Sequence, residues 1–250
     1  MFNRELLKKS VEQYGILLSD GQCEMFEKYS SLLREWNEKI NLTAILDEDE
    51  IIIKHFSDSL SIYPYIKQYI DKISSCGGLK ERISFIDVGT GAGFPGIPVK
   101  IIFPDISLTL LDSTEKKIKF LNVLTREMSF NDCRIINMRA EEAGKDFLYR
   151  EKYDICAARA VAKLPVLLEL CMPFIKLNGI FIALKGIGEE EIKESQGAVK
   201  LLGGEIMLTN KLNLYKDMGS RMVLIIKKIE KLPVKYPRKF ISITNNPIKN

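Results

Sequence analysis

The segment from Ser84 to Lys100, SFIDVGTGAGFPGIPVK, constrains the fold more than any other part of the chain. It opens with a short apolar run that predicts a buried strand and that contains one acid, Asp87. Three alternating glycines follow, at 89, 91 and 93, and Pro95 then marks the start of a helix. Glycines let the backbone turn sharply, and they leave bare main chain beside the unpaired N–H groups of the helix. This pattern predicts a loop for a nucleotide-type cofactor at the carboxyl end of a strand.

The glycine spacing alone is ambiguous, because Gly91, Gly93 and Gly96 also match the G-x-G-x-x-G fingerprint of dinucleotide-binding proteins. That fingerprint places a pyrophosphate on the helix N-terminus. Here Asp87 comes just before the glycines, where a carboxylate would repel a phosphate but would suit a cationic ligand. S-adenosylmethionine carries a sulfonium and an ammonium group and no phosphate. The loop therefore favours S-adenosylmethionine, and NAD stays open as the alternative.

A second acid, Asp112, ends another predicted strand, Ile106 to Leu111, about twenty residues after the glycines. At this spacing a doubly wound fold places an acid on a ribose diol, which suits both adenosine cofactors. The same carboxylate could cap the helix expected to run as far as Met128. The two roles are compatible.

The rest of the chain alternates between strand and helix patterns, which predicts a mainly parallel sheet in an α/β fold. The last two strands have only a short loop between them and should pair antiparallel. A seven-stranded sheet closed by an antiparallel strand is the usual methyltransferase arrangement, and dinucleotide enzymes lack this hairpin. The remaining strands are expected at 134–138, 153–158, 179–185, 205–214 and 221–227, with helices at 164–174 and 189–202.

Residues 1–83 have helical periodicity and are expected to form a helical extension before the cofactor domain. Ser19 with Gln22 predicts a capping box, and Asp47 with Glu50 starts another helix. The chain then divides into a helical cap at 1–83, a cofactor domain at 84–228 and a basic tail at 229–250. A cap of this kind commonly shapes a substrate cleft, but it could also only pack.

Composition excludes several classes of protein. An apolar fraction of 46% is ample for a core. No apolar run approaches the roughly twenty residues of a membrane helix, and the first residues contain no apolar signal core, so a cytoplasmic protein is expected. Five cysteines without a C-x-x-C pair, and a single histidine, allow no zinc site. Three cysteines in predicted core elements are expected to act as small apolar fillers: Cys133, Cys156 and Cys171.

Positive charge gathers at the C-terminal end. Seven basic residues and one acid lie from Lys227 onward, although the whole chain has a net charge of only +4. Such a segment suits contact with a nucleic acid, and it equally suits a solvated tail that lysines keep in solution.

The chain resembles the bacterial guanine-N7 methyltransferases of small-subunit ribosomal RNA, the RsmG type, also called glucose-inhibited division protein B. The resemblance runs nearly end to end, and the G-F-P-G extension of the glycine loop is among its most specific parts. The motifs that carry it are, in order, Trp36-Asn37 with Asn41-Leu42-Thr43, His55 with Asp58-Ser59-Leu60, Asp87 to Gly96, Leu111-Asp112-Ser113 with Lys116-Lys117 and Phe120-Leu121, Arg139-Ala140-Glu141, Ala158-Arg159-Ala160-Val161-Ala162, Lys185-Gly186, and Tyr236-Pro237-Arg238-Lys239.

This resemblance implies a Rossmann-like class I methyltransferase fold and S-adenosylmethionine as cofactor. The residues implied for cofactor binding are Gly89, Gly91 and Phe94 at the methionine end, Asp112, Ser113 and Thr114 at the ribose and adenine edge, Ala140 and Glu141 at the adenine, and Arg159 closing the site. The implied partner is 16S ribosomal RNA or the small ribosomal subunit, met by a monomer. The candidates for RNA contact are Arg139, Lys235, Arg238 and Lys239; the sequence after Lys239 departs from the family pattern.

The implied reaction needs no general base, because guanine N7 is a lone-pair acceptor that carries no proton. No catalytic residue is therefore assigned, and His55 is expected to be structural. The alternatives are a methyltransferase of another substrate, an NAD-dependent oxidoreductase and a non-catalytic division factor.

Overall fold

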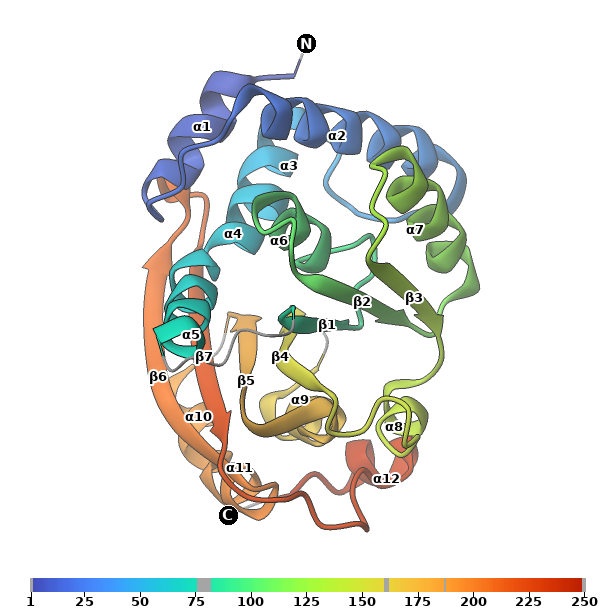
Figure 1. Cartoon of the computed structure of the whole chain (residues 1–250), viewed down its shortest axis with the longest axis vertical. Coiled ribbons are helices and arrows are strands. Elements are labelled where there is room, and N and C mark those ends of the chain that lie inside the picture. Colours follow the sequence, from blue (N-terminus) through green and yellow to red (C-terminus); the bar gives the residue numbers. More distant parts are fainter. Residues whose placement is uncertain (1, 76–81, 160–161, 187, 249–250) are drawn as a thin grey trace.

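The computed structural model describes residues 2–75, 82–159, 162–186 and 188–248, and it arranges them around one seven-stranded sheet (Figure 1). The strand order is β3-β2-β1-β4-β5-β7-β6, and only β7 runs antiparallel to its neighbours. The predicted class of fold is therefore confirmed. The strands are β1 (Ser84–Val88), β2 (Ser107–Asp112), β3 (Cys133–Asn137), β4 (Tyr153–Arg159), β5 (Ile175–Lys185), β6 (Gly204–Asn213) and β7 (Ser220–Lys228).

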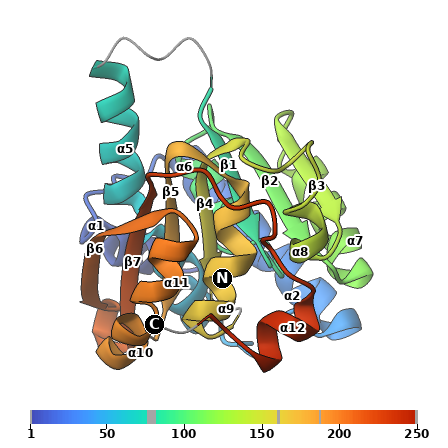
Figure 2. The same ribbon diagram turned by 90° about the horizontal axis from the view of Figure 1, so that it is seen from below.

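Helices cover both faces of the sheet (Figure 1 and Figure 2). None of the helices in the described ranges has the length and apolar character of a membrane span. One face carries α1 (Arg4–Glu12), α2 (Asp20–Ile40), α3 (Glu48–Ile51), a π-helical turn (Ile52–Ser57), α4 (Asp58–Leu60), α5 (Tyr63–Ser75), α6 (Gly96–Ile102) and α7 (Glu115–Glu127). The other face carries α8 (Ala140–Ala143), α9 (Leu164–Cys171), α10 (Glu189–Glu194), α11 (Gln196–Leu201) and α12 (Phe240–Asn245), and short 3-10 turns lie at Met172–Phe174 and Tyr215–Asp217.

The N-terminal helices, here called the cap (residues 2–75), share one hydrophobic core with the sheet. Three residues on one face of α2, Phe26, Tyr29 and Leu33, are fully buried. At the start of this helix the predicted capping box forms, since Ser19 Oγ accepts from Gln22 N and Gln22 Oε1 accepts from Ser19 N. The boundary at residue 83 thus divides the sequence but does not divide the core.

Two predicted boundaries differ from the structure because of backbone chemistry, and one predicted helix is divided into two. β5 begins at Ile175 and passes through Gly179, where a Cβ atom would lie 2.7 Å from the carbonyl oxygen of Asp154 on β4. Gly179 is needed for this close approach of two strands and does not start the strand. The helix after β4 ends at Cys171, because Pro173 has no N–H to continue it. The helix predicted at 189–202 divides into α10 and α11 at Ser195.

The cysteines within the described residues fill apolar space, as expected. Cys23, Cys156 and Cys171 are buried and Cys133 is half-buried. Burial raises the pKa of Cys133 to about 12, so this thiol is a poor nucleophile at neutral pH. Cys76 lies outside the described residues, as do Ala160 and Val161 of the A-R-A-V-A motif.

The C-terminal segment folds back on the second helical layer, and we call residues 229–248 the strap. Leu232, Tyr236 and Ile243 of the strap are buried. Arg238 Nη2 donates to Oε2 of Glu169 at 2.6 Å, and the backbone N–H of Arg238 donates to Oε1 at 2.8 Å. Because Glu169 on α9 is fully buried, this pair fixes the strap to the domain. The segment is not a solvated tail.

Arg238→Ala should lower the free energy of unfolding by about 3 kcal/mol, because it leaves a buried carboxylate without its cation. Lys235→Ala is the matched control: it removes one positive charge from the same segment, where the side chain is exposed. Its effect should stay within about 0.5 kcal/mol. Urea denaturation measures both values, and equal stabilities of the two variants would contradict this account of the strap.

Candidate functional site

The glycine loop is built from backbone conformations that favour glycine. Gly89, Gly91 and Gly93 have φ values of 70°, 61° and 102°. A Cβ atom on Gly93 would lie 2.7 Å from both the Tyr29 hydroxyl and the Ile97 side chain, so packing demands that glycine. A Cβ on Gly91 would meet no protein atom within 4 Å. Gly91 therefore leaves bare main chain facing open space.

The buried carboxylate of Asp87 fixes the glycine loop by accepting hydrogen bonds from it. Its Oδ2 accepts hydrogen bonds from Thr90 Oγ1 at 2.7 Å and from the Gly96 N–H at 2.8 Å, and the side chain is fully buried. Burial raises the pKa of Asp87 to about 7, although both hydrogen bonds favour the carboxylate. This acid does not line the cavity described below. The expectation that it faces a cationic ligand is therefore corrected: it shapes the loop.

A cavity of about 370 Å³ lies beyond the carboxyl ends of the central strands. We call it the cofactor cavity. Its lining also includes side chains that the resemblance does not assign to the cofactor, among them Lys117 and Phe240. The predicted cofactor-binding residues that line it are Gly89, Asp112, Ser113, Thr114, Ala140, Glu141 and Arg159, together with the RNA-contact candidate Arg139. Gly91 and Phe94 are not in this lining.

Asp112 ties two parts of the cavity wall together. Its Oδ1 accepts from the Thr114 N–H at 2.8 Å, and its Oδ2 accepts from the Gly91 N–H at 2.9 Å. Lys117 Nζ lies 3.5 Å from the same Oδ2. Asp112 is thus not the N-cap of α7, whose N-cap is Thr114. It fixes the glycine loop against the start of that helix, and its contact with a ribose remains a prediction.

Arg159, at the end of β4, is held by the cap. Its Nη1 donates to Oδ2 of Asp58 at 3.1 Å and to the Lys54 carbonyl at 3.0 Å, and its Nη2 donates to His55 Nδ1 at 3.1 Å. The guanidinium lies 4.8 Å from the ring centre of Phe94. The Arg159 side chain is only 13% exposed. It is therefore an enclosed, ion-paired arginine that also lines the cavity.

Phe94 and His55 form the layer behind Arg159. Phe94 is only 5% exposed and stacks on His55 at 4.6 Å, so it supports the wall from inside. The family resemblance implies a contact of Phe94 with the cofactor, and that contact stays a prediction. Burial and the Arg159 charge lower the pKa of His55 to about 3, which keeps the imidazole neutral. Since Nδ1 accepts from Arg159, the proton is on Nε2 and is donated to Thr43 Oγ1 at 2.7 Å.

The strap supplies Phe240, which the sequence analysis missed. Phe240 begins α12 and lines the cavity, with the Arg139 guanidinium 5.7 Å from its ring centre. The available signal was an aromatic residue directly after the Y-P-R-K motif.

The candidates for RNA contact separate into two groups. Arg139, Lys235 and Lys239 are exposed. Arg238 is ion-paired with the buried Glu169, and its contact with a phosphate stays a prediction. No group of three or more His, Cys, Asp or Glu side chains suited to a metal ion occurs among the described residues.

Comparison with known proteins gives a consistent result. Residues 22–215 match the model of the family described as rRNA small subunit methyltransferase G, GidB. Proteins named ribosomal RNA small subunit methyltransferase G are 49% identical in Acetivibrio thermocellus, over 98% of this chain and 96% of that protein, and 46% identical in Clostridium beijerinckii, over 98% of each. The Staphylococcus aureus protein of that name, from strain JH9, is 45% identical over 94% of each chain.

Among solved structures, the antibiotic-resistance methyltransferase Kmr matches with a TM-score of 0.51 and 14% identity. The match covers 63% of this chain and 92% of that one. At this identity the similarity concerns the fold alone, and it supports the class I methyltransferase arrangement.

The buried Asp87 predicts a specific pH dependence. Its pKa is about 7 in the folded protein and near 3.8 ordinarily, so between these values the folded state keeps a proton that the unfolded chain has lost. This contribution to stability is complete below the lower value and is lost as the pH rises through 7. The stability of the wild type relative to Asp87→Asn should thus fall by up to about 3 kcal/mol from pH 5 to pH 8. Urea denaturation of both proteins measures it, and a difference independent of pH would refute it.

Proposed function

The chain belongs to the rRNA small subunit methyltransferase G family, and we propose that it transfers a methyl group from S-adenosylmethionine to N7 of a guanine in a 16S rRNA loop. Membership in this family makes it an S-adenosylmethionine-dependent methyltransferase of ribosomal RNA. The oxidoreductase, the small-molecule methyltransferase and the non-catalytic division factor therefore lose their support. The observation that carries the proposal is the gathering of the family's cofactor residues around one cavity.

The residues around the cofactor cavity fit S-adenosylmethionine. Gly91 leaves open space above bare main chain, and the wall contains two carboxylates, Asp112 and Glu141, that suit hydroxyl and amino donors. The nine residues proposed to hold the cofactor are those that the family resemblance implied. Gly91 contributes its main chain. Phe94 contributes indirectly, because it packs against His55 and Arg159 behind the cavity wall. When bound, S-adenosylmethionine supplies an electrophilic methyl group on a sulfonium.

The protein's part in the reaction is alignment, because guanine N7 offers an in-plane lone pair and carries no proton. His55 is neutral and both its nitrogens are hydrogen-bonded, so it does not serve as a base. A methylated guanine is cationic, and a bare arginine nearby would oppose its formation. The carboxylate of Asp58, which is shared with Arg221, offsets part of the charge of Arg159, and this lowers the electrostatic cost of placing that side chain at the cavity.

We assign RNA contact to Arg139, Lys235 and Lys239, which are exposed. Arg139 and the start of α12 lie at the cofactor cavity, so a phosphate held there would bring RNA to the cavity mouth. We further propose that the cap shapes the RNA cleft, that the enzyme acts as a monomer, and that it works in the cytoplasm on free 16S rRNA or on the small subunit.

The direct test is transfer of labelled methyl groups from S-adenosylmethionine to 16S rRNA and to small ribosomal subunits that lack the modification. Mass mapping of the product should locate one added methyl group at N7 of a guanine. Methylation of a different base or atom would refute the assigned specificity, and tight NADH binding without methyl transfer would refute the activity.

Gly91→Val should weaken S-adenosylhomocysteine binding at least about a hundredfold, because the side chain enters the open space and strains a positive φ. Gly15→Val is the matched control, since Gly15 also has a positive φ, of 79°, and open space around it, but lies on the cap away from the cavity. Both variants carry similar backbone strain. Calorimetry should find near wild-type affinity for Gly15→Val, and an equal loss in both would attribute the effect to strain.

A further inference from the structure

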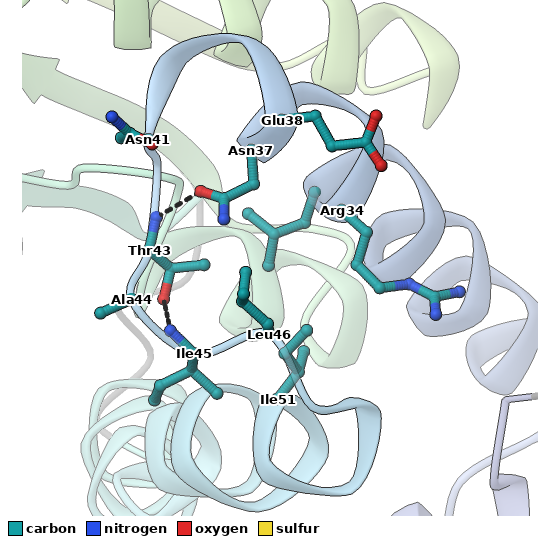
Figure 3. Close-up of a pocket in the computed structure, with 10 residues that line it drawn as sticks. Arg34, Asn37, Glu38, Asn41, Thr43, Ala44, Ile45, Leu46 and Ile51 are labelled. Atoms are coloured by element: carbon teal, nitrogen blue, oxygen red, sulfur yellow. Dashed lines mark hydrogen bonds between the residues drawn. The ribbon is translucent and has the colours of Figure 1, made fainter.

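A second cavity, larger than the cofactor cavity at about 540 Å³, lies wholly within the cap (Figure 3). We call it the cap cavity. It is an open cavity bordered by the C-terminal half of α2, the loop after it and the start of α3. Its walls combine apolar side chains with amides and one hydroxyl, chiefly Leu33, Asn37, Asn41, Thr43, Ile45 and Leu46. None of these residues belongs to the cofactor cavity.

Asn37 points to a ligand in the cap cavity. Its side chain is only 8% exposed, and its Oδ1 accepts from the Thr43 N–H at 2.8 Å. Its Nδ2 has no hydrogen-bond partner among the described residues, and Figure 3 shows this nitrogen directed into the cavity. This nitrogen is accessible from the cavity, so it is a free donor for a ligand that presents an acceptor.

Thr43 adds a second donor and connects the two cavities. Its Oγ1 accepts from the Ile45 N–H at 3.0 Å and from His55 Nε2, which leaves its own proton without an acceptor in the described structure. His55 in turn accepts from Arg159, which lines the cofactor cavity. The cap cavity is therefore separated from the methyl-transfer site by one imidazole and one guanidinium.

The wall chemistry identifies the kind of ligand. Ile45 and Leu46 offer apolar surfaces for a flat group, and Asn37 and Thr43 offer donors for acceptors at its edge. A phosphate is disfavoured, because Arg34 is already paired with Glu48 at 3.1 Å and Glu38 adds a carboxylate at the rim. A flat, neutral group with apolar faces and edge acceptors is a nucleobase.

We infer that the cap cavity binds an unpaired base of the RNA substrate, other than the guanine that is methylated. The His55–Arg159 layer stands between this cavity and the cofactor, so a base held here cannot be the acceptor. The inference rests on the proposed function, since RNA supplies the base. One base bound in the cap cavity and the target guanine bound on the other side of Arg159 would together fix the register of the RNA loop.

The sharpest variant is Asn37→Asp, which keeps the oxygen that accepts from Thr43 and replaces only the free NH₂ donor. Ser31→Asp is its control, because it adds the same charge at an exposed position on the same helix outside the cavity. Asn37→Asp should raise the KM for 16S rRNA three- to tenfold, roughly one hydrogen bond, while the affinity for S-adenosylhomocysteine stays unchanged. Ser31→Asp should leave the KM within about twofold.

A second pair tests the apolar wall. Leu46 is 67% exposed and lines the cavity, whereas Leu17 is 86% exposed and lies elsewhere on the cap, so alanine at either should leave the fold intact. Leu46→Ala should raise the KM for RNA, and Leu17→Ala should not. Wild-type KM values for both Asn37→Asp and Leu46→Ala would overturn the inference and leave the methyltransferase assignment standing.

Failure of the proposed function would look different. If the wild type transfers no methyl group to rRNA, quenching of the single tryptophan, Trp36, next to Asn37 still measures RNA binding. Weaker binding by Asn37→Asp than by Ser31→Asp would then support the cap cavity as a base site without the reaction. Equal binding by the two variants would overturn it.

Discussion

The buried carboxylate of Asp58 is the interaction on which the site depends. It accepts from Arg159 of β4 and from Arg221 of β7, and its side chain is only 2% exposed. A buried ion pair contributes little net stability, because desolvation offsets the attraction. The pair instead fixes position, because one carboxylate from the cap holds the end of β4 and the start of β7. Arg159, and through it His55 and Phe94, takes its place from this carboxylate, and the wall of the cofactor cavity follows.

Buried carboxylates also fix the position of the glycine loop. Asp87 holds the inner side of the loop through Thr90 and Gly96, and Asp112 holds its outer side through Gly91. Both acids therefore act on the backbone before any ligand arrives. A loop fixed on two sides has little conformational freedom left to lose on binding, and such preorganisation favours affinity.

Strands and the glycine loop could be predicted from sequence, because apolar runs ended by Asp87, Asp112 and glycines are local signals. Contacts between distant segments could not. Asp58 is 101 residues from Arg159 and 163 from Arg221, and no local pattern pairs them. Glu169 is the one acid in the otherwise apolar helix LPVLLELC, and nothing local identifies Arg238 as its partner. The ion pair between Arg238 and Glu169 fixes the strap two residues before Phe240, which lines the cavity.

The position of β7 between β5 and β6 has a consequence for assembly. In the described sheet β6 pairs only with β7, although β6 comes first in the chain. β6 can therefore join the sheet only through its pairing with β7. We expect the two strands to form a hairpin first and then to pair with β5 together. Docking brings Arg221 to Asp58. The last strand to join the sheet therefore also locks the first helices in place, and the two ends of the fold should gain protection from hydrogen exchange together.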